Sequence, residues 1–191
     1  MKRHRIILSL ILTISFSVTN ISFASLKDTQ IWLKKLGKNY TIQEIKNLKV
    51  LYLEFAKITD ISGLKELKKL ETLNLNGNKK LSDLSALKGL KNLKTLELRG
   101  TQVRDLSALK GLENLKVLEL SGTRVRDLSV LKRLENLIWL SLFSTQVSDI
   151  SPLKGLTKLN NLNLNLRGTQ VSKKDIEALK KALPDCSIIY Q

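Results

Sequence analysis

Leucines follow a strict pattern along most of the chain, in which two leucines flank one residue that is usually polar. Among the first five copies this motif recurs every 22 residues, apart from one step of 23. Residues 90–111 and 112–133 are identical at 16 of 22 positions, so the chain consists largely of one repeated unit. The copies of the motif lie at 51–53, 73–75, 96–98, 118–120, 140–142 and 162–164.

Each unit predicts a short strand followed by a tight helical turn. The leucines of L-x-L have a period of two, so both point into a core while the residue between them points outward. Asp-x-Ser then begins the return segment, and Ser151-Pro152 predicts an N-cap serine with proline at the first helical position. Stacked in parallel, such units form an α/β solenoid with strands on one face and single helical turns on the other.

The full unit, L-x-x-L-x-L-x-x-(T/N)-x-(V/L)-x-D-(L/I)-S-x-L-K-x-L, resembles the leucine-rich repeat. It is similar to the 22-residue form found in bacterial internalins and in the phosphatase-1 regulatory repeat subunit, over roughly residues 48–181. This resemblance implies a right-handed curved superhelix, with parallel strands on the concave face and short helical turns on the convex face. The chain departs from the family at the conserved asparagine, which survives only as Asn78. Threonine replaces it in later units, where its hydroxyl is expected to donate to a backbone carbonyl.

Four segments are expected along the chain. Residues 1–24 have a basic start, an apolar stretch and small residues at Ser22 and Ala24, which predicts a cleaved secretory signal. The alternative is a membrane anchor, but the apolar stretch of about 13 residues is shorter than the roughly 20 that a spanning helix needs. Residues 25–47 predict a helical N-terminal cap, 48–172 about six repeats, and 173–191 a C-terminal cap. We expect a secreted or periplasmic monomer with no membrane span after the leader is removed.

Several local signals refine the two caps. Thr41-x-x-Glu44 fits a capping box at a helix start, and residues 173–183 have the spacing of an amphipathic helix. Residues 187–190 predict one closing strand. Two extra residues near 161–166 break the step of the repeat, which predicts a bulge there.

The charge of the chain is strongly positive, with 33 Lys plus Arg against 17 Asp plus Glu. Three of the basic residues and no acidic one lie in the leader, so the rest of the chain carries +13. Most of this charge falls at the edges, the caps and the convex side. It indicates either contact with an anionic polymer or lipid, or only a solvated surface. Nucleic acid is not expected as a partner, because no stacking aromatics accompany the lysines.

Catalysis and metal binding find little support in the sequence. The only histidine, His4, lies in the expected leader, and no phosphate-binding loop, nucleophile elbow or zinc motif occurs. One aspartate per repeat could form a carboxylate array, but strict periodicity favours local turn hydrogen bonds instead. Cys186 fits a small buried residue of the cap better than a reactive thiol. We therefore expect neither an enzyme nor a cofactor.

The outward strand positions are where a partner would bind, since the resemblance implies protein recognition by the concave face. Trp139 and Phe143 alternate outward on one strand, and exposed aromatic residues are typical of binding hot spots. The alternative is that the C-terminal bulge or cap covers them. The resemblance implies a protein partner, and we expect it at a host surface or in the cell's own envelope. The residues expected to bind it are Trp139, Phe143, Val117, Glu119, Glu97, Arg99 and Tyr52.

Overall fold

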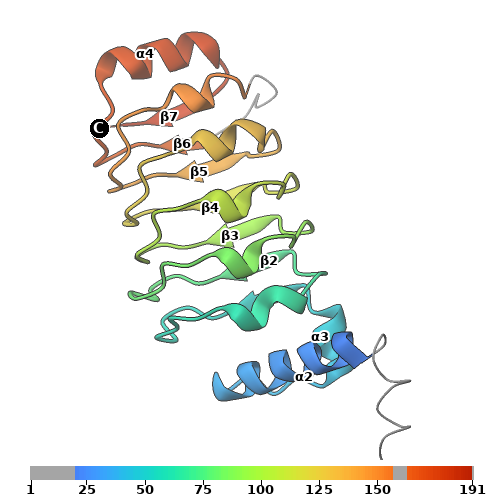
Figure 1. The fold of residues 1–191 in the computed structure, drawn as a ribbon. Helices are drawn as coiled ribbons and strands as arrows, with labels where there is room; N and C mark the ends of the chain where they lie inside the picture. Colours follow the sequence, from blue (N-terminus) through green and yellow to red (C-terminus); the bar gives the residue numbers. More distant parts are fainter. Residues whose placement is uncertain (1–19, 157–162, 191) are drawn as a thin grey trace, which may run out of the picture.

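The computed structural model describes residues 20–156 and 163–190, which form a stack of repeats with a helix at each end (Figure 1). The expected leader, residues 1–24, lies mostly outside the described residues. Helix α2 (Asn20–Lys35) and helix α3 (Ile42–Asn47) precede the strands, and helix α4 (Lys173–Ala182) comes before the last strand. No helix in the described residues is long and apolar enough to cross a membrane.

The strands form one parallel seven-stranded sheet in chain order, which confirms the predicted solenoid. Each strand has three residues, and its central leucine or isoleucine lies next to its equivalent in the neighbouring strands. The five central leucines of the first five strands are buried, as the period of two requires. The strands are β1 (Val50–Tyr52), β2 (Thr72–Asn74), β3 (Thr95–Glu97), β4 (Val117–Glu119), β5 (Trp139–Ser141), β6 (Asn163–Asn165) and β7 (Ser187–Ile189).

The returns between strands are short 3-10 turns, each preceded by the repeated aspartate. Asp105 accepts the backbone N–H of Ser107 at 2.7 Å and the Ser107 hydroxyl at 2.8 Å. This local bonding confirms the turn role expected for the aspartates. The backbone bond recurs at Asp60, Asp83, Asp127 and Asp149. The turns are η1 (Ser62–Glu66), η2 (Ser85–Leu87), η3 (Ser107–Leu109), η4 (Ser129–Arg133) and η5 (Ser151–Leu153).

The N-cap role expected for Ser151 is wrong. Ser151 is the first residue of η5, Ile150 occupies the N-cap position, and no side chain of the N-cap residue makes a cap bond. The Asp149 carboxylate instead accepts the N–H of Ser151 at 2.8 Å. Because Asp149, two residues earlier, already accepts this N–H, Ser151 is not needed as the cap and lies inside the turn. Pro152 stands near its start, as the sequence predicts.

A left-handed glycine follows two of the short return turns, η2 and η3. After η3, Lys110 and Gly111 form a tight turn in which Gly111 has φ +85°, and the N–H of Leu112 donates to Leu109 O at 3.0 Å. Glycine adopts this left-handed backbone without strain. Arg133 stands at the equivalent position of the next repeat, and there the 3-10 turn continues to Arg133 itself.

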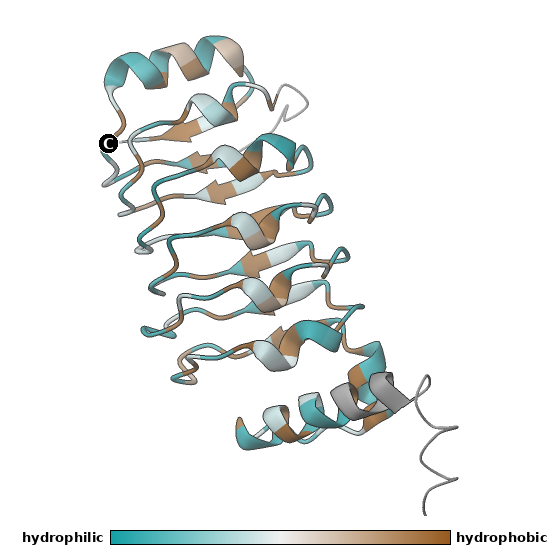
Figure 2. Ribbon diagram, in the orientation of Figure 1, coloured by the Kyte–Doolittle hydropathy of each residue, from teal (hydrophilic) through white to brown (hydrophobic). Residues whose placement is uncertain are grey.

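A polar ladder runs beneath the strands inside the otherwise apolar core. Asn78 donates to Leu53 O and Leu75 O and accepts from the N–H of Ile58, which satisfies its buried amide. The threonines that replace asparagine in later repeats each donate to the carbonyl three residues earlier, at 2.6–2.7 Å, as the sequence predicts: Thr101, Thr123, Thr145 and Thr169. In Figure 2 hydrophobic colour recurs in the strands up the stack, and hydrophobic and hydrophilic colours alternate along the connecting segments.

The two caps close the core at the ends of the stack. Helix α2 packs against η1, and the Thr29 hydroxyl donates to Gly63 O at 2.9 Å. The capping box of α3 is present, since Thr41 and Glu44 each accept a backbone N–H of the other. Helix α4 begins after Ser172, whose hydroxyl accepts the N–H of Asp175, and β7 then adds the closing strand.

The register of the last repeat corrects one assignment. The sequence places its motif at 162–164, but Leu164 pairs with Leu140 and Leu166 is buried, so the motif lies at 164–166. The step from Leu140 is therefore two residues longer than the repeat. The outward positions are then Asn163 and Asn165, whereas Asn161 lies outside the described residues. A bulge was expected near 161–166; residues 161–162 are likewise outside the described part, and 163–165 form β6 in register with β5.

Candidate functional site: the outer face of the sheet

The outward side chains of the strands form three rows that run across the stack, which we call the sheet face. Each row follows from parallel pairing in register, because equivalent residues of neighbouring strands lie side by side. The first row is Val50, Thr72, Thr95, Val117, Trp139 and Asn163, and the second is Tyr52, Asn74, Glu97, Glu119, Ser141 and Asn165. Backbone bonds continue the register to a third row, Glu54, Asn76, Arg99, Ser121, Phe143 and Arg167.

The C-terminal apolar patch consists of Trp139 and Phe143, which are outward residues of the sheet face, and of Ile138 at the adjoining edge position, equivalent to Lys94 and Lys116. Phe143 is 40% exposed and Ile138 is 49% exposed, while Trp139 is partly buried between Val117 and Asn163 of the neighbouring strands. Helix α4 contacts η5, on the return side of the stack. Phe143 is therefore open to solvent, and Trp139 presents part of its ring.

The centre of the sheet face is polar and internally hydrogen-bonded. Asn76 donates to Glu97 Oε2 at 2.6 Å and accepts the N–H of Arg99 at 2.7 Å. Glu119 accepts the N–H of Ser121 at 2.6 Å. These bonds hold both carboxylates in fixed positions, next to each other on β3 and β4.

Two outward positions of the centre are buried, which the strand pattern does not predict. Ser121 and Ser141 lie in adjacent repeats, and their hydroxyls are 2.7 Å apart in a mutual hydrogen bond. The sheet face is therefore not exposed at every outward position, and Ser121 and Ser141 do not offer their hydroxyls to a partner.

A second apolar patch lies at the N-terminal end of the sheet face. Tyr52 is 52% exposed and Phe55 is 72% exposed, beside the exposed Val50. Phe55 has a left-handed backbone, with φ +52°, and its ring packs directly over Gly77. Any side chain at position 77 would collide with that ring, so the glycine fixes where the Phe55 side chain lies.

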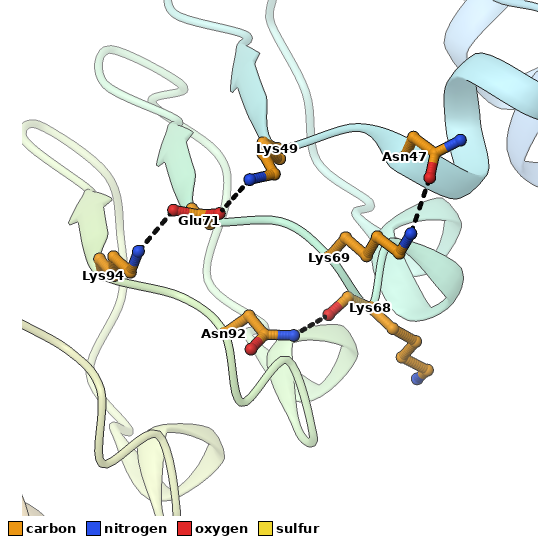
Figure 3. A network of polar contacts seen from close by, with 7 residues as sticks. All are labelled: Asn47, Lys49, Lys68, Lys69, Glu71, Asn92 and Lys94. Atoms are coloured by element: carbon orange, nitrogen blue, oxygen red, sulfur yellow. Dashed lines mark hydrogen bonds and ion pairs between the residues drawn. The ribbon is translucent and has the colours of Figure 1, made fainter.

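A charged edge flanks the N-terminal part of the sheet face (Figure 3). Glu71 bridges two lysines of the neighbouring repeats, at 3.0 Å to Lys49 Nζ and 2.6 Å to Lys94 Nζ. The hydrogen bond from Lys94 and, to a smaller extent, the one from Lys49 hold the pKa of the Glu71 carboxyl below its ordinary value. Both lysines are solvent-exposed, so this edge joins three repeats while presenting cationic groups.

Asparagines on the returns tie each repeat to the one before, a feature that the sequence reading missed. Asn92 donates to Lys68 O at 2.7 Å, and the equivalent Asn114 and Asn136 make the same bond to the preceding repeat. Lys69 stands at this position one repeat earlier, and its amine donates to Asn47 Oδ1 at 2.7 Å (Figure 3). The recurrence of asparagine every 22 residues was the signal for this role.

Metal ligation and thiol chemistry find no geometric support in the described ranges. There, no group of three or more His, Cys, Asp or Glu side chains is close enough to hold a metal ion. Cys186 is half-buried against the core, and burial raises the pKa of its thiol to about 11. At neutral pH the reactive thiolate form is therefore scarce.

The comparison with known families decides the identity of the repeats. Residues 46–89 and 91–133 match the family model described as leucine-rich repeats in two copies. The repeats of this chain are leucine-rich repeats. No curated protein sequence matches it significantly.

Solved leucine-rich repeat structures share this fold. An internalin (InlF) of Listeria monocytogenes is 24% identical with a TM-score of 0.61, over 87% of this chain and 56% of that one. Internalin C2 of the same organism is 24% identical with a TM-score of 0.56, over 87% of this chain and 92% of that one. A Leptospira interrogans leucine-rich repeat protein is 21% identical with a TM-score of 0.50, over 76% of this chain and 61% of that one. This leucine-rich repeat protein thus spans little more than half of the InlF chain, and the likeness establishes the internalin-like fold.

Proposed function

We propose that this leucine-rich repeat protein is an exported, non-catalytic recognition module that binds a protein partner through its sheet face. The observation that carries the proposal is the C-terminal apolar patch, where Phe143 and Ile138 are exposed and Trp139 is partly exposed, next to the polar centre of the sheet face. Apolar aromatic groups exposed next to a polar rim are typical of interface hot spots. The partner acts outside the cytoplasm, at a host surface or in the cell's own envelope.

The fixed carboxylates give the sheet face its specificity. Glu97 and Glu119 lie beside the apolar patch and are held by Asn76 and by the Ser121 backbone. Pre-positioned charges steer association and disfavour partners with like charge. We therefore expect a partner surface with an apolar protrusion for the patch and a cationic group opposite the carboxylates. Val117, Arg99 and Tyr52 line the path of such a partner across the sheet face.

Affinity capture from host-surface and own-envelope extracts tests this function, with the full chain compared with Trp139→Ala/Phe143→Ala. If the patch is the anchor, the double variant raises the dissociation constant of the captured partner by about thirtyfold or more, since hot-spot truncations cost about 2 kcal/mol. Ile31→Ala is the matched control, because Ile31 is equally exposed but lies on α2, away from the sheet face.

The control decides how a loss is interpreted. Circular dichroism first shows that each variant keeps the wild-type fold. A dissociation constant that rises by less than about twofold in the double variant contradicts a partner site on the sheet face. So does a rise in Ile31→Ala as large as the rise in the double variant.

A further inference from the structure

The return side of the stack contains a cationic groove. The 3-10 turns that border it lie on the other side of each repeat from the strands (Figure 1). The groove lies between η3 and η4 and has a volume of about 590 Å³. Four basic side chains line it: Arg104, Lys110, Lys132 and Arg133. All four are exposed, and they converge from two successive repeats.

The repeat provides an internal reference for this groove. The equivalent space between η1 and η2 has a volume of about 370 Å³, and Lys65 is its only basic side chain. Thr59 lines it at the repeat position that Arg104 occupies in the larger groove. The backbone plan is the same in both places, so the enrichment in cations is a property of the side chains at one site and not of the fold.

The acidic residues of the two grooves sharpen the contrast. Asp105 and Asp127 line the larger groove, and both carboxylates accept bonds from Ser107 and Ser129 within their own turns. Four basic and two acidic side chains give its lining a net charge of +2. The smaller groove, with one lysine and two aspartates, has a net charge of −1.

We propose that the groove between η3 and η4 binds phosphate groups of an anionic polymer. Guanidinium groups match the geometry of phosphate oxygens with two parallel hydrogen bonds, and lysine amines add compact positive charge. The groove is open, so a chain of phosphates can enter it from solvent. This site is independent of the sheet face, and protein recognition there neither requires nor excludes it.

Arg104 contributes more than Arg133 to this site. Arg133 also borders a neighbouring cavity lined by Glu113 and Glu135, which offset part of its charge. Arg104 has only the turn-bound Asp105 and Asp127 as acidic neighbours in the groove. We therefore expect the single variant Arg104→Thr to weaken phosphate binding more than Arg133→Gly.

Isothermal titration calorimetry of the full chain with inorganic tripolyphosphate tests the site at low salt. The variant Arg104→Thr/Arg133→Gly takes its residues from other repeats, Thr59 and Gly111, so the return turns keep a sequence that the fold already accommodates. The variant is expected to bind about tenfold more weakly, or by about 1.4 kcal/mol, because it removes two solvent-exposed charge contacts. The control variant Lys173→Gln/Lys174→Gln removes the same amount of charge from the exposed start of α4. It should change the affinity for tripolyphosphate by less than about twofold.

The outcomes distinguish phosphate binding at the groove from general electrostatic attraction by a basic protein. Equal weakening in the groove variant and the α4 variant, or no tripolyphosphate binding by the wild type, overturns the proposal. Trp139→Ala/Phe143→Ala binds tripolyphosphate like the wild type, so a failure of partner recognition is distinguishable from a failure of the groove. Co-sedimentation with phosphatidylglycerol vesicles, against phosphatidylcholine vesicles, and competition by poly(glycerol phosphate) tell a lipid source of the phosphate from a soluble polymer.

Discussion

At the scale of single residues, Gly63 shows how the N-terminal cap fits the first repeat. The later repeats place Ala86, Ala108, Val130 and Pro152 at this position. In the first repeat the space is taken by the indole of Trp32, and a Cβ at position 63 would lie 2.5 Å from Trp32 Cδ2. The glycine therefore allows the cap helix to seal the core. Its backbone has no left-handed φ, so the requirement is one of space alone.

The substitution Gly63→Ala tests this close packing. We expect it to lower the free energy of unfolding by about 1–3 kcal/mol, because the indole must shift out of its site. Gly155→Ala is the matched control, since nothing lies within 4 Å of a Cβ there and its φ is not left-handed either. Urea unfolding measures both, and a destabilisation of Gly63→Ala no greater than that of Gly155→Ala would contradict the packing argument.

At the scale of elements, the Asp-x-Ser turn makes the returns sensitive to acid. Hydrogen bonds from the Ser107 N–H and hydroxyl lower the pKa of Asp105 from its ordinary value of 3.8, and those from the Ser151 hydroxyl and N–H lower that of Asp149 likewise. A carboxylate whose pKa is lower in the folded state than in the unfolded state stabilises the folded state at pH values above the unfolded pKa. That contribution is lost as the pH falls below 3.8 and through the folded pKa.

The double variant Asp105→Asn/Asp149→Asn separates charge from shape, since asparagine can still accept the serine N–H. Its melting temperature should lie below that of the wild type at pH 7, and the gap should narrow as the pH falls below about 4. Thermal melts followed by circular dichroism between pH 7 and pH 2.5 measure it. A gap that stays constant over this range would show that proton binding at these turns does not contribute.

The elements were predictable from the sequence wherever the period controls them. The leucine spacing gives the strands and their inward side, and Asp-x-Ser gives the return turns, because both depend on residues close in the chain. The register of the last repeat was assigned wrongly because leucines stand at 162, 164 and 166, so that L-x-L fits both 162–164 and 164–166. The structure selects the second, since Leu164 pairs with Leu140. The contact of Trp32 with Gly63, the buried pair Ser121 and Ser141, and the cationic groove depend on neighbours about 20 or more residues away.

At the scale of the whole molecule, the repeats are close to interchangeable units. Deleting residues 112–133 joins Gly111 to Leu134 at equivalent positions and brings Thr95 of β3 beside Trp139 of β5. Repeat proteins gain stability from each unit and from each contact between neighbours. We expect the shortened chain to fold with lower stability and with a urea m-value reduced by about 10–15%, in proportion to the surface lost.

Urea unfolding by circular dichroism checks this deletion against one of residues 118–128. The second deletion removes half a repeat, so it places the leucines of the core out of register and should abolish the cooperative transition. A 22-residue deletion that unfolds as completely as the half-repeat deletion would show that the stack depends on a particular central unit.

The order of the strands also determines how the molecule would respond to a pulling force. Neighbours in the sheet are neighbours in the chain, and helices α2 and α4 lie at opposite ends of the stack (Figure 1). Tension between the two ends acts along the strand-to-strand hydrogen bonds and the asparagine links, so repeats peel away singly instead of rupturing together. Each one releases about 75 Å of chain for its 22 residues. A partner held on the sheet face would thus be joined to the rest of the molecule by a tether that lengthens in steps.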